Sequence, residues 1–74
     1  MKNELLSLFA DILPAIDFEA SDALVTEGII SSVDVVQIVG ELSMEYGINF
    51  AFEDLTEDNF NSIDAIAALV ESKL

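Results

Sequence analysis

The chain has 74 residues, of which 53% are hydrophobic, and its 15 acidic residues and two lysines give a formal net charge of −13. This length predicts a single domain over residues 1–74, with one small core that its elements must share. Because the chain contains no histidine and no cysteine, it has no thiol nucleophile, no imidazole base and no His or Cys metal site. The composition therefore argues against an enzyme.

The charge is almost entirely negative, since the two basic side chains, Lys2 and Lys73, lie at opposite ends of the chain. Such a field repels nucleic acids and anionic membranes, and it speeds encounters with basic protein surfaces. The same negative charge also favours solubility. The apolar runs are too short to cross a bilayer, and the N-terminus lacks the features of a signal peptide. We expect a cytoplasmic monomer that binds basic protein partners, with no nucleic acid and no membrane insertion.

The first periodic segment spans roughly residues 3–16, where apolar residues recur at steps of three and four, as on one face of a helix. These residues are Leu5, Phe9, Ile12, Leu13 and Ile16. Pro14 is expected to end this helix early. The next stretch, residues 17–31, is irregular and longer than most connections in a compact domain. Its apolar residues should pin it to the core, and they are Phe18, Leu24, Ile29 and Ile30.

A second helix is predicted from Ser32 to about Tyr46, ending at Gly47, a residue suited to the left-handed conformation that closes helices. Its expected core stripe consists of Val35, Ile38, Val39, Leu42 and Tyr46. An acidic flank is formed by Asp34, Glu41 and Glu45.

The same helix carries a second apolar stripe that faces away from the core. It consists of Val33, Val36, Gly40 and Met44. Such a stripe is ordinary scatter of apolar residues on the surface, a core that extends further around the helix than expected, or a face on which a partner docks. Gly40 costs about 1 kcal/mol relative to alanine inside a helix. It therefore indicates a close approach, by a partner or by another helix of the same fold.

Residues 48–62 lead to the last helix, and within them Thr56 and the acidic residues after it favour a short helical turn. The final helix should start near Asn61 or Ser62, with Glu71 and Lys73 facing water. Its expected apolar stripe is Ile63, Ile66, Ala67, Val70 and Leu74. The prediction is an all-α fold, a small four-helix bundle of three main helices and one short helix, with a long loop between the first two.

Asp54, Thr56 and Asp58 have the spacing of the first ligands in an EF-hand loop. The sixth position is Asn59 instead of glycine and the twelfth is Ala65 instead of glutamate, so the sharp turn and the bidentate ligand are missing. An acidic helix cap explains the pattern better than a calcium site.

Two adjacent serines mark the start of the second helix. Ser31 and Asp34 match a capping box, with Ser31 as the N-cap and Asp34 three residues later. This leaves Ser32 on the exposed first turn, where the positive end of the helix dipole would favour an attached phosphate.

These residues carry a resemblance to a known family. The stretch "GIISSVDVVQIVGELSMEYGINF" resembles the modification site and second helix of acyl and peptidyl carrier proteins, and "LTEDNFNSIDAIAALV" is similar to their last segment. Ser32-Val33-Asp34 stands where many members have Ser-Leu-Asp, and Tyr46-Gly47-Ile48 closes the helix at the expected place. The similarity covers residues 24–70.

The resemblance implies that Ser32 receives 4′-phosphopantetheine from coenzyme A and that an acyl or aminoacyl group is carried as a thioester on its thiol. It also implies a partner-docking face, made of Val33, Asp34, Val36, Gly40, Glu41, Met44 and Glu45. The implied partners are a phosphopantetheinyl transferase and an adenylating ligase, synthase or acyltransferase with a basic docking surface.

The sequence departs from the family pattern at the residue before the modified serine, which is Ser31 instead of the usual Asp. Gln37 and Ser43 also stand where fatty-acid carriers often have acidic residues. These departures count against recognition by fatty-acid-type enzymes, and the spacing after Gly28 leans toward stand-alone carriers such as D-alanyl carriers, or toward synthase-type carriers. Two alternatives stay open: an acidic docking module of the same fold that is never modified, and calcium buffering through bulk acidity.

Overall fold

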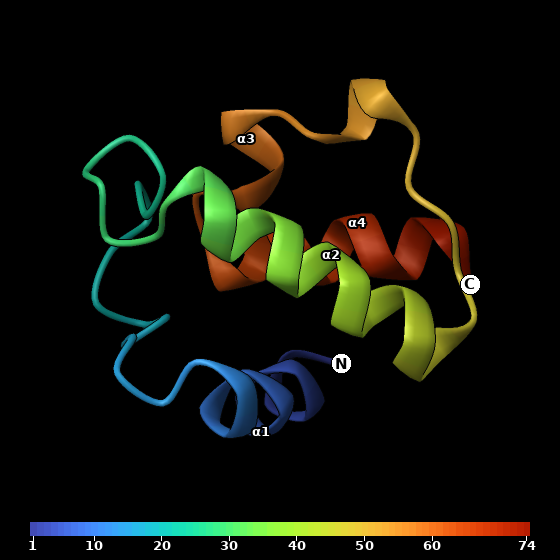
Figure 1. Ribbon diagram of the computed structural model, residues 1–74, viewed down its shortest axis with the longest axis horizontal. Coiled ribbons are helices and arrows are strands. Elements are labelled where there is room, and N and C mark those ends of the chain that lie inside the picture. Colours follow the sequence, from blue (N-terminus) through green and yellow to red (C-terminus); the bar gives the residue numbers. More distant parts are fainter.

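The computed structural model describes residues 1–74, and all its regular secondary structure is helical, which confirms the predicted fold class. It contains α1 (Lys2–Ile12), α2 (Ser32–Tyr46), the 3₁₀ turn η1 (Phe52–Asp54), α3 (Glu57–Phe60) and α4 (Ile63–Lys73). Figure 1 shows α2 across the front with α4 behind it, α1 below, and η1 and α3 along the top. The three main helices and the short α3 were predicted, whereas η1 was not.

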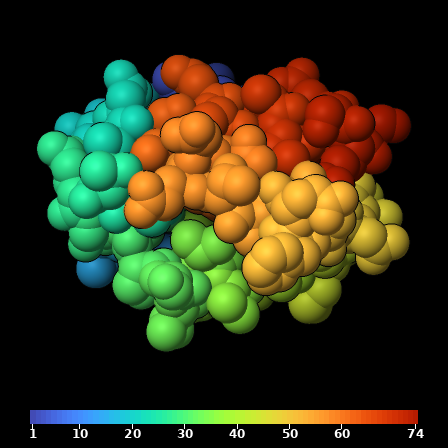
Figure 2. Space-filling model, turned by 90° about the horizontal axis from the view of Figure 1, so that it is seen from above, coloured from blue at the N-terminus to red at the C-terminus, as the bar shows by residue number.

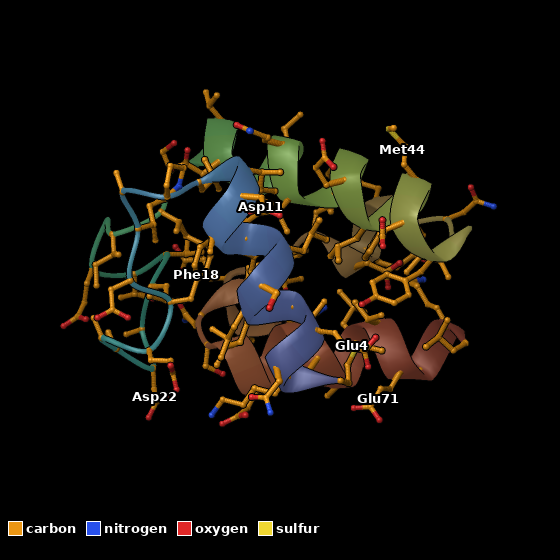
Figure 3. All side chains as sticks on the ribbon, turned by 90° about the horizontal axis from the view of Figure 1, so that it is seen from below. Glu4, Asp11, Phe18, Asp22, Met44 and Glu71 are labelled. Atoms are coloured by element: carbon orange, nitrogen blue, oxygen red, sulfur yellow. The ribbon has the colours of Figure 1, made fainter.

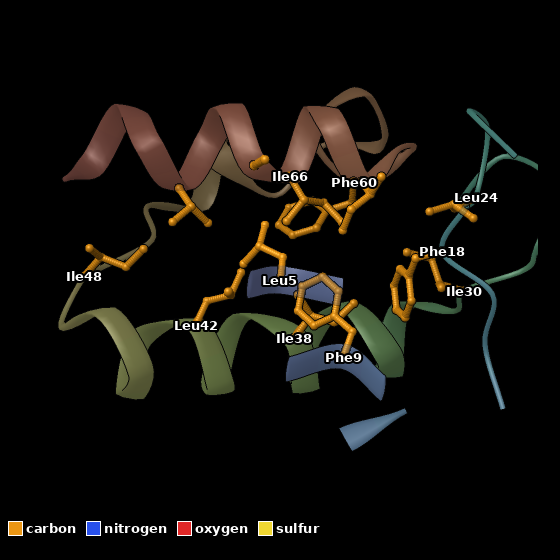
Figure 4. Packing of buried hydrophobic residues seen from close by; sticks show 13 residues of the cluster. Leu5, Phe9, Phe18, Leu24, Ile30, Ile38, Leu42, Ile48, Phe60 and Ile66 are labelled. Carbon is orange, nitrogen blue, oxygen red and sulfur yellow. The ribbon is translucent and has the colours of Figure 1, made fainter. Parts of the chain in front are cut away.

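The core consists of 13 buried residues, all of them hydrophobic. The three long helices supply Leu5, Phe9, Ile38, Leu42, Ile63, Ile66, Ala67 and Val70, and the rest of the chain supplies Phe18, Leu24, Ile30, Ile48 and Phe60. Figure 4 shows these side chains meeting between α1, α2 and α4. Each long helix thus presents one apolar face to a common centre, as its periodicity predicted.

The long loop after α1 is held by its own apolar side chains. Phe18, Leu24 and Ile30 are buried and Ile29 is half-buried, which confirms the predicted anchoring. The ring of Phe18 lies against that of Phe9 in α1, with the ring centroids 4.8 Å apart and the planes tilted by 39°. The loop is therefore part of the packed structure that leads into α2.

Helix α1 ends at Ile12, earlier than the periodicity to Ile16 implied. Leu13 leaves the helical conformation, with φ −135° and ψ 65°, because the residue before a proline is disfavoured in the helical region. Ile12, Leu13 and Ile16 still pack against the core, but none of them is fully buried.

Helix α2 has the bounds that the sequence predicted. It starts after Ser31 and ends at Gly47, whose φ of 64° and ψ of 34° are the left-handed conformation that glycine adopts without steric cost. Of its expected core stripe, Ile38 and Leu42 are buried. Tyr46 is half-buried at its end. Burial, followed by the nearby charges of Glu4 and Glu45, raises the pKa of the Tyr46 hydroxyl.

Helix α4 starts at Ile63, and the Ser62 hydroxyl caps it by accepting a hydrogen bond from the Ala65 amide at 3.0 Å. The predictions for Leu74 and Lys73, at the C-terminal end of α4, are wrong. Leu74 was expected in the core stripe but is 69% exposed, because the helix ends at Lys73 and Leu74 lies beyond it.

Lys73 was expected to face water, but it is half-buried and joins the end of α4 to η1. Its Nζ lies 2.7 Å from Oδ2 of Asp54 and 5.5 Å from the centroid of the Phe50 ring. Hydrogen bonds from Lys73 and from the Ala51 amide lower the pKa of the Asp54 carboxyl. An ion pair thus links the C-terminal end of α4 to η1, although the sequence pattern had predicted that Lys73 faces water.

None of the helices combines the length and the apolar character that a membrane span requires.

Candidate functional site

The two adjacent serines have different environments. The Ser31 hydroxyl accepts a hydrogen bond from the Asp34 amide at 3.2 Å, and the Asp34 carboxylate accepts one from the Ser31 amide at 2.9 Å. This confirms the predicted capping box. Ser32 is the first residue of α2, its side chain takes no part in the box, and it is exposed. One hydroxyl therefore starts the helix and the other remains available for chemistry.

The start of α2 favours a negative group at Ser32. The amides of Ser32 and Val33 belong to the first helical turn and have no carbonyl partner within the helix. Together with the helix dipole they stabilise an anion there, by roughly 0.3–1 kcal/mol at an exposed site. The Asp34 carboxylate, as part of the capping box, already interacts with the positive end of this helix.

Ser32 also borders a groove of about 290 Å³. The groove is lined by Val25, Ser32, Val35, Val36, Leu55, Thr56 and Glu57. These residues come from the long loop, from α2, from the segment after η1 and from the first residue of α3. Figure 2 shows this face, with the green start of α2 next to the orange α3. Its apolar walls and its open side suit a flexible arm attached to the serine.

Asn61 holds the loop that forms one wall of the groove. Its side-chain oxygen accepts hydrogen bonds from the amides of Val25 at 2.9 Å and Thr26 at 3.1 Å, and its side-chain nitrogen donates to the Thr26 hydroxyl at 3.1 Å. Its backbone carbonyl accepts a further bond from the Leu24 amide at 2.8 Å. Sequence reasoning did not identify Asn61, since no local pattern links residues that are 35 apart in the chain.

The outward stripe of α2 is exposed throughout. Val33, Val36 and Met44 are among the most exposed large apolar residues, and Met44 is 80% exposed. Figure 3 shows the Met44 side chain pointing away from the other helices. Gly40 is also exposed, and a Cβ placed on it would meet no atom within 4 Å. Of the two alternatives for Gly40, the approach of another helix of the same fold is thus excluded, and docking of a partner stays a prediction.

The acidic flank of α2 has no cation beside it. Glu45 is exposed, while Asp34 and Glu41 are half-buried. The positive groups of the chain pair elsewhere: the terminal amine with Glu4, Lys2 with Glu19 and Asp64, and Lys73 with Asp54. The face around Ser32 is consequently acidic and apolar at once.

The acidic side chains do not form a group that could hold a metal ion. Asp54, the first residue of the EF-hand-like pattern, is paired with Lys73. Thr56 caps α3 by accepting a hydrogen bond from the Asn59 amide at 3.3 Å. Both residues thus have structural partners in place of calcium.

Comparison with known proteins agrees with this geometry. The family model described as the phosphopantetheine attachment site matches residues 3–70. Searches among curated proteins and among solved structures found no match. Since the family model spans nearly the whole chain, the protein belongs to the phosphopantetheine-binding carrier family, whose members are non-catalytic and carry covalently attached 4′-phosphopantetheine.

Proposed function

We propose that Ser32 is the attachment residue and that this protein carries an acyl or aminoacyl group as a thioester on the prosthetic arm. The observation that carries the proposal is that the two serines have different environments. Ser31 is occupied as the helix cap, whereas Ser32 is exposed at the edge of the groove.

Attachment needs a nucleophilic oxygen that an enzyme can reach. The Ser32 oxygen would form a new bond to phosphorus in the pyrophosphate of coenzyme A, its proton would leave to a base of the transferase, and adenosine 3′,5′-bisphosphate would depart. The start of α2 would stabilise the resulting phosphodiester charge. The bound group supplies a terminal thiol, which this cysteine-free chain lacks.

Membership of the family implies a phosphopantetheinyl transferase and biosynthetic enzymes as partners. We propose that the biosynthetic partner is an adenylating ligase, a synthase or an acyltransferase, acting in the cytoplasm. Val33, Val36 and Met44 would supply the apolar contacts, and Glu41 and Glu45 would steer basic surfaces onto the carrier. The open space above Gly40 would let a partner approach the helix backbone.

The test is intact mass after incubation of the purified chain with coenzyme A and a broad-specificity phosphopantetheinyl transferase. We expect a gain of one phosphopantetheinyl group in the wild type and in Ser31→Ala, and no gain in Ser32→Ala. A gain that survives in Ser32→Ala would move the attachment to another residue and contradict the proposal.

A wild-type chain that gains no mass would favour a second function, an acidic docking module that keeps the fold and is never modified. One observation gives this alternative its weight. Ser31 replaces the Asp that usually precedes the modified serine, so the cap is retained while a negative charge beside the site is lost.

A further inference from the structure

Phe52 is the most exposed large apolar residue of the chain, with 90% of its surface accessible. It opens the short turn η1, which sequence reasoning did not predict. Single exposed apolar residues are common, but burying a phenylalanine stabilises a protein by roughly 1.5–3 kcal/mol. A ring left this far outside a core with so few residues therefore calls for a further role.

The turn that carries Phe52 is fixed on several sides. The Asp54 carboxylate accepts a hydrogen bond from the Ala51 amide at 2.8 Å and pairs with Lys73 at 2.7 Å. The Asp54 carbonyl accepts a bond from the Asn59 side chain at 2.8 Å, and the Leu55 amide donates to the Phe52 carbonyl at 3.1 Å. These hydrogen bonds and the ion pair thus fix the conformation of the turn that carries the exposed Phe52 ring.

The turn that carries Phe52 is joined through Leu55 to the groove beside Ser32, since the Leu55 amide donates to the Phe52 carbonyl. Leu55, one turn later and 44% exposed, lines that groove together with Ser32 and Val36. Figure 2 shows η1, in yellow-orange, on the same face as the green start of α2. An enzyme that approaches the Ser32 hydroxyl from this face can therefore also reach η1.

The surroundings of Phe52 are acidic. Glu53, Glu57 and Asp58 are all exposed, and none of them forms an ion pair, because the cations of the chain pair with other carboxylates. The complementary surface is therefore an apolar socket with a basic rim, the charge arrangement that speeds association and sets its orientation.

We propose that Phe52 is an anchor residue for the phosphopantetheinyl transferase, with its ring in an apolar socket of that enzyme and Glu53 on the socket's basic rim. This inference rests on the proposed modification of Ser32. The transferase is the partner that it fits best, since that enzyme must bring its own surface up to the Ser32 oxygen. The anchor extends the docking surface beyond α2 to the segment between α2 and α3.

The test is the kinetics of modification of Phe52→Ala and Phe52→Leu with coenzyme A and a broad-specificity transferase. An apolar anchor removed from an interface lowers affinity by about tenfold or more. We expect KM for the Phe52→Ala carrier to rise about tenfold with kcat little changed, and Phe52→Leu to recover most of the loss. Equal thermal unfolding of the three proteins would show that the effect is not structural.

Two variants that each remove one negative charge give a second, independent test of the anchor. Glu53→Gln should raise KM at low salt and converge with the wild type at high salt, because salt screens exposed charges. The matched control is Asp11→Asn, an exposed change on α1, which lies on the opposite side of the molecule from η1 in Figure 1. It should leave KM unchanged.

An unchanged KM in Phe52→Ala would overturn the anchor, and so would an equal rise in Asp11→Asn and Glu53→Gln. Either result leaves the modification of Ser32 standing, since the wild type would still be loaded. A wild-type chain that is not loaded contradicts the proposed function itself, so the two failures are distinguishable.

Discussion

The side-chain amide of Gln37 in α2 donates a hydrogen bond of 3.2 Å to the backbone carbonyl of Ile12, the last residue of α1. The final carbonyls of a helix have no partner within it, and the last turn of α1 contains no basic residue to compensate. An acidic residue at position 37 could not donate this bond. The departure from the usual acidic residue at this position therefore has a structural consequence, because it ties α2 to the end of α1.

Gln37→Glu should destabilise the protein. It removes the donor and sets a carboxylate near the negative end of the α1 dipole, and exposed hydrogen bonds of this kind contribute about 0.5–1 kcal/mol. The measurement is the free energy of unfolding in urea. Gln37→Arg is the matched variant, since it keeps a donor and adds a favourable charge, and it should be at least as stable as the wild type. Equal stability of the Glu and Arg variants would contradict this role.

Asn61→Ala should cost about 2 kcal/mol of unfolding free energy, since it leaves the amides of Val25 and Thr26 without their acceptor. Asn61→Asp keeps the acceptor oxygen and loses only the bond that the side-chain nitrogen donates to the Thr26 hydroxyl, so it should cost less. Hydrogen exchange reports the local effect directly: the two amides should lose protection in the Ala variant. Unchanged protection there would show that the side chain does not hold the loop.

Ser31→Ala should destabilise the chain by about 1 kcal/mol, because the N-cap acceptor for the Asp34 amide is lost. Ser31→Asp preserves a cap and restores the residue usual in the family, so its stability should match the wild type. Its value of kcat/KM with a fatty-acid-type transferase should rise several-fold, since a charge at an interface rim acts on association. A rate equal to that of the wild type would show that such enzymes do not read this charge.

The pair of Asp54 and Lys73 should contribute to stability in a pH-dependent way. The hydrogen bond from Lys73 lowers the pKa of the Asp54 carboxyl below its ordinary value of 3.8. A carboxyl whose folded-state pKa is depressed adds stability above the ordinary pKa, and that stability is lost as the pH falls through the folded-state value. Wild type should therefore be more stable than Lys73→Met near neutral pH, and the difference should shrink below pH 3.8.

Urea unfolding of both proteins across this range checks the prediction. The comparison between the two proteins matters more than either curve, because the other carboxyl groups of a chain with net charge −13 also titrate there. A constant difference between the two proteins at all pH values would assign the role of Lys73 to its contact with Phe50 instead.

The bounds and caps of individual helices could be predicted from the sequence. The bounds of α2, its capping box and its closure at Gly47 were predicted correctly, as was the Thr56 cap of α3. These features depend on residues three or four apart, whose contacts form wherever the helix forms. The apolar periodicity likewise identified the residues that became the core of each long helix.

The tertiary structure alone decided what distant residues do to one another. It joined Lys73 to Asp54, Gln37 to Ile12 and Asn61 to the loop at Val25. It also placed Ser32 beside Leu55 in one groove and left Phe52 and Leu74 in solvent. Such contacts depend on how the helices pack and where the chain turns back, and no local spacing encodes them. The sequence thus pointed to the serine that we propose is modified, and the packing of three segments built the surface around it.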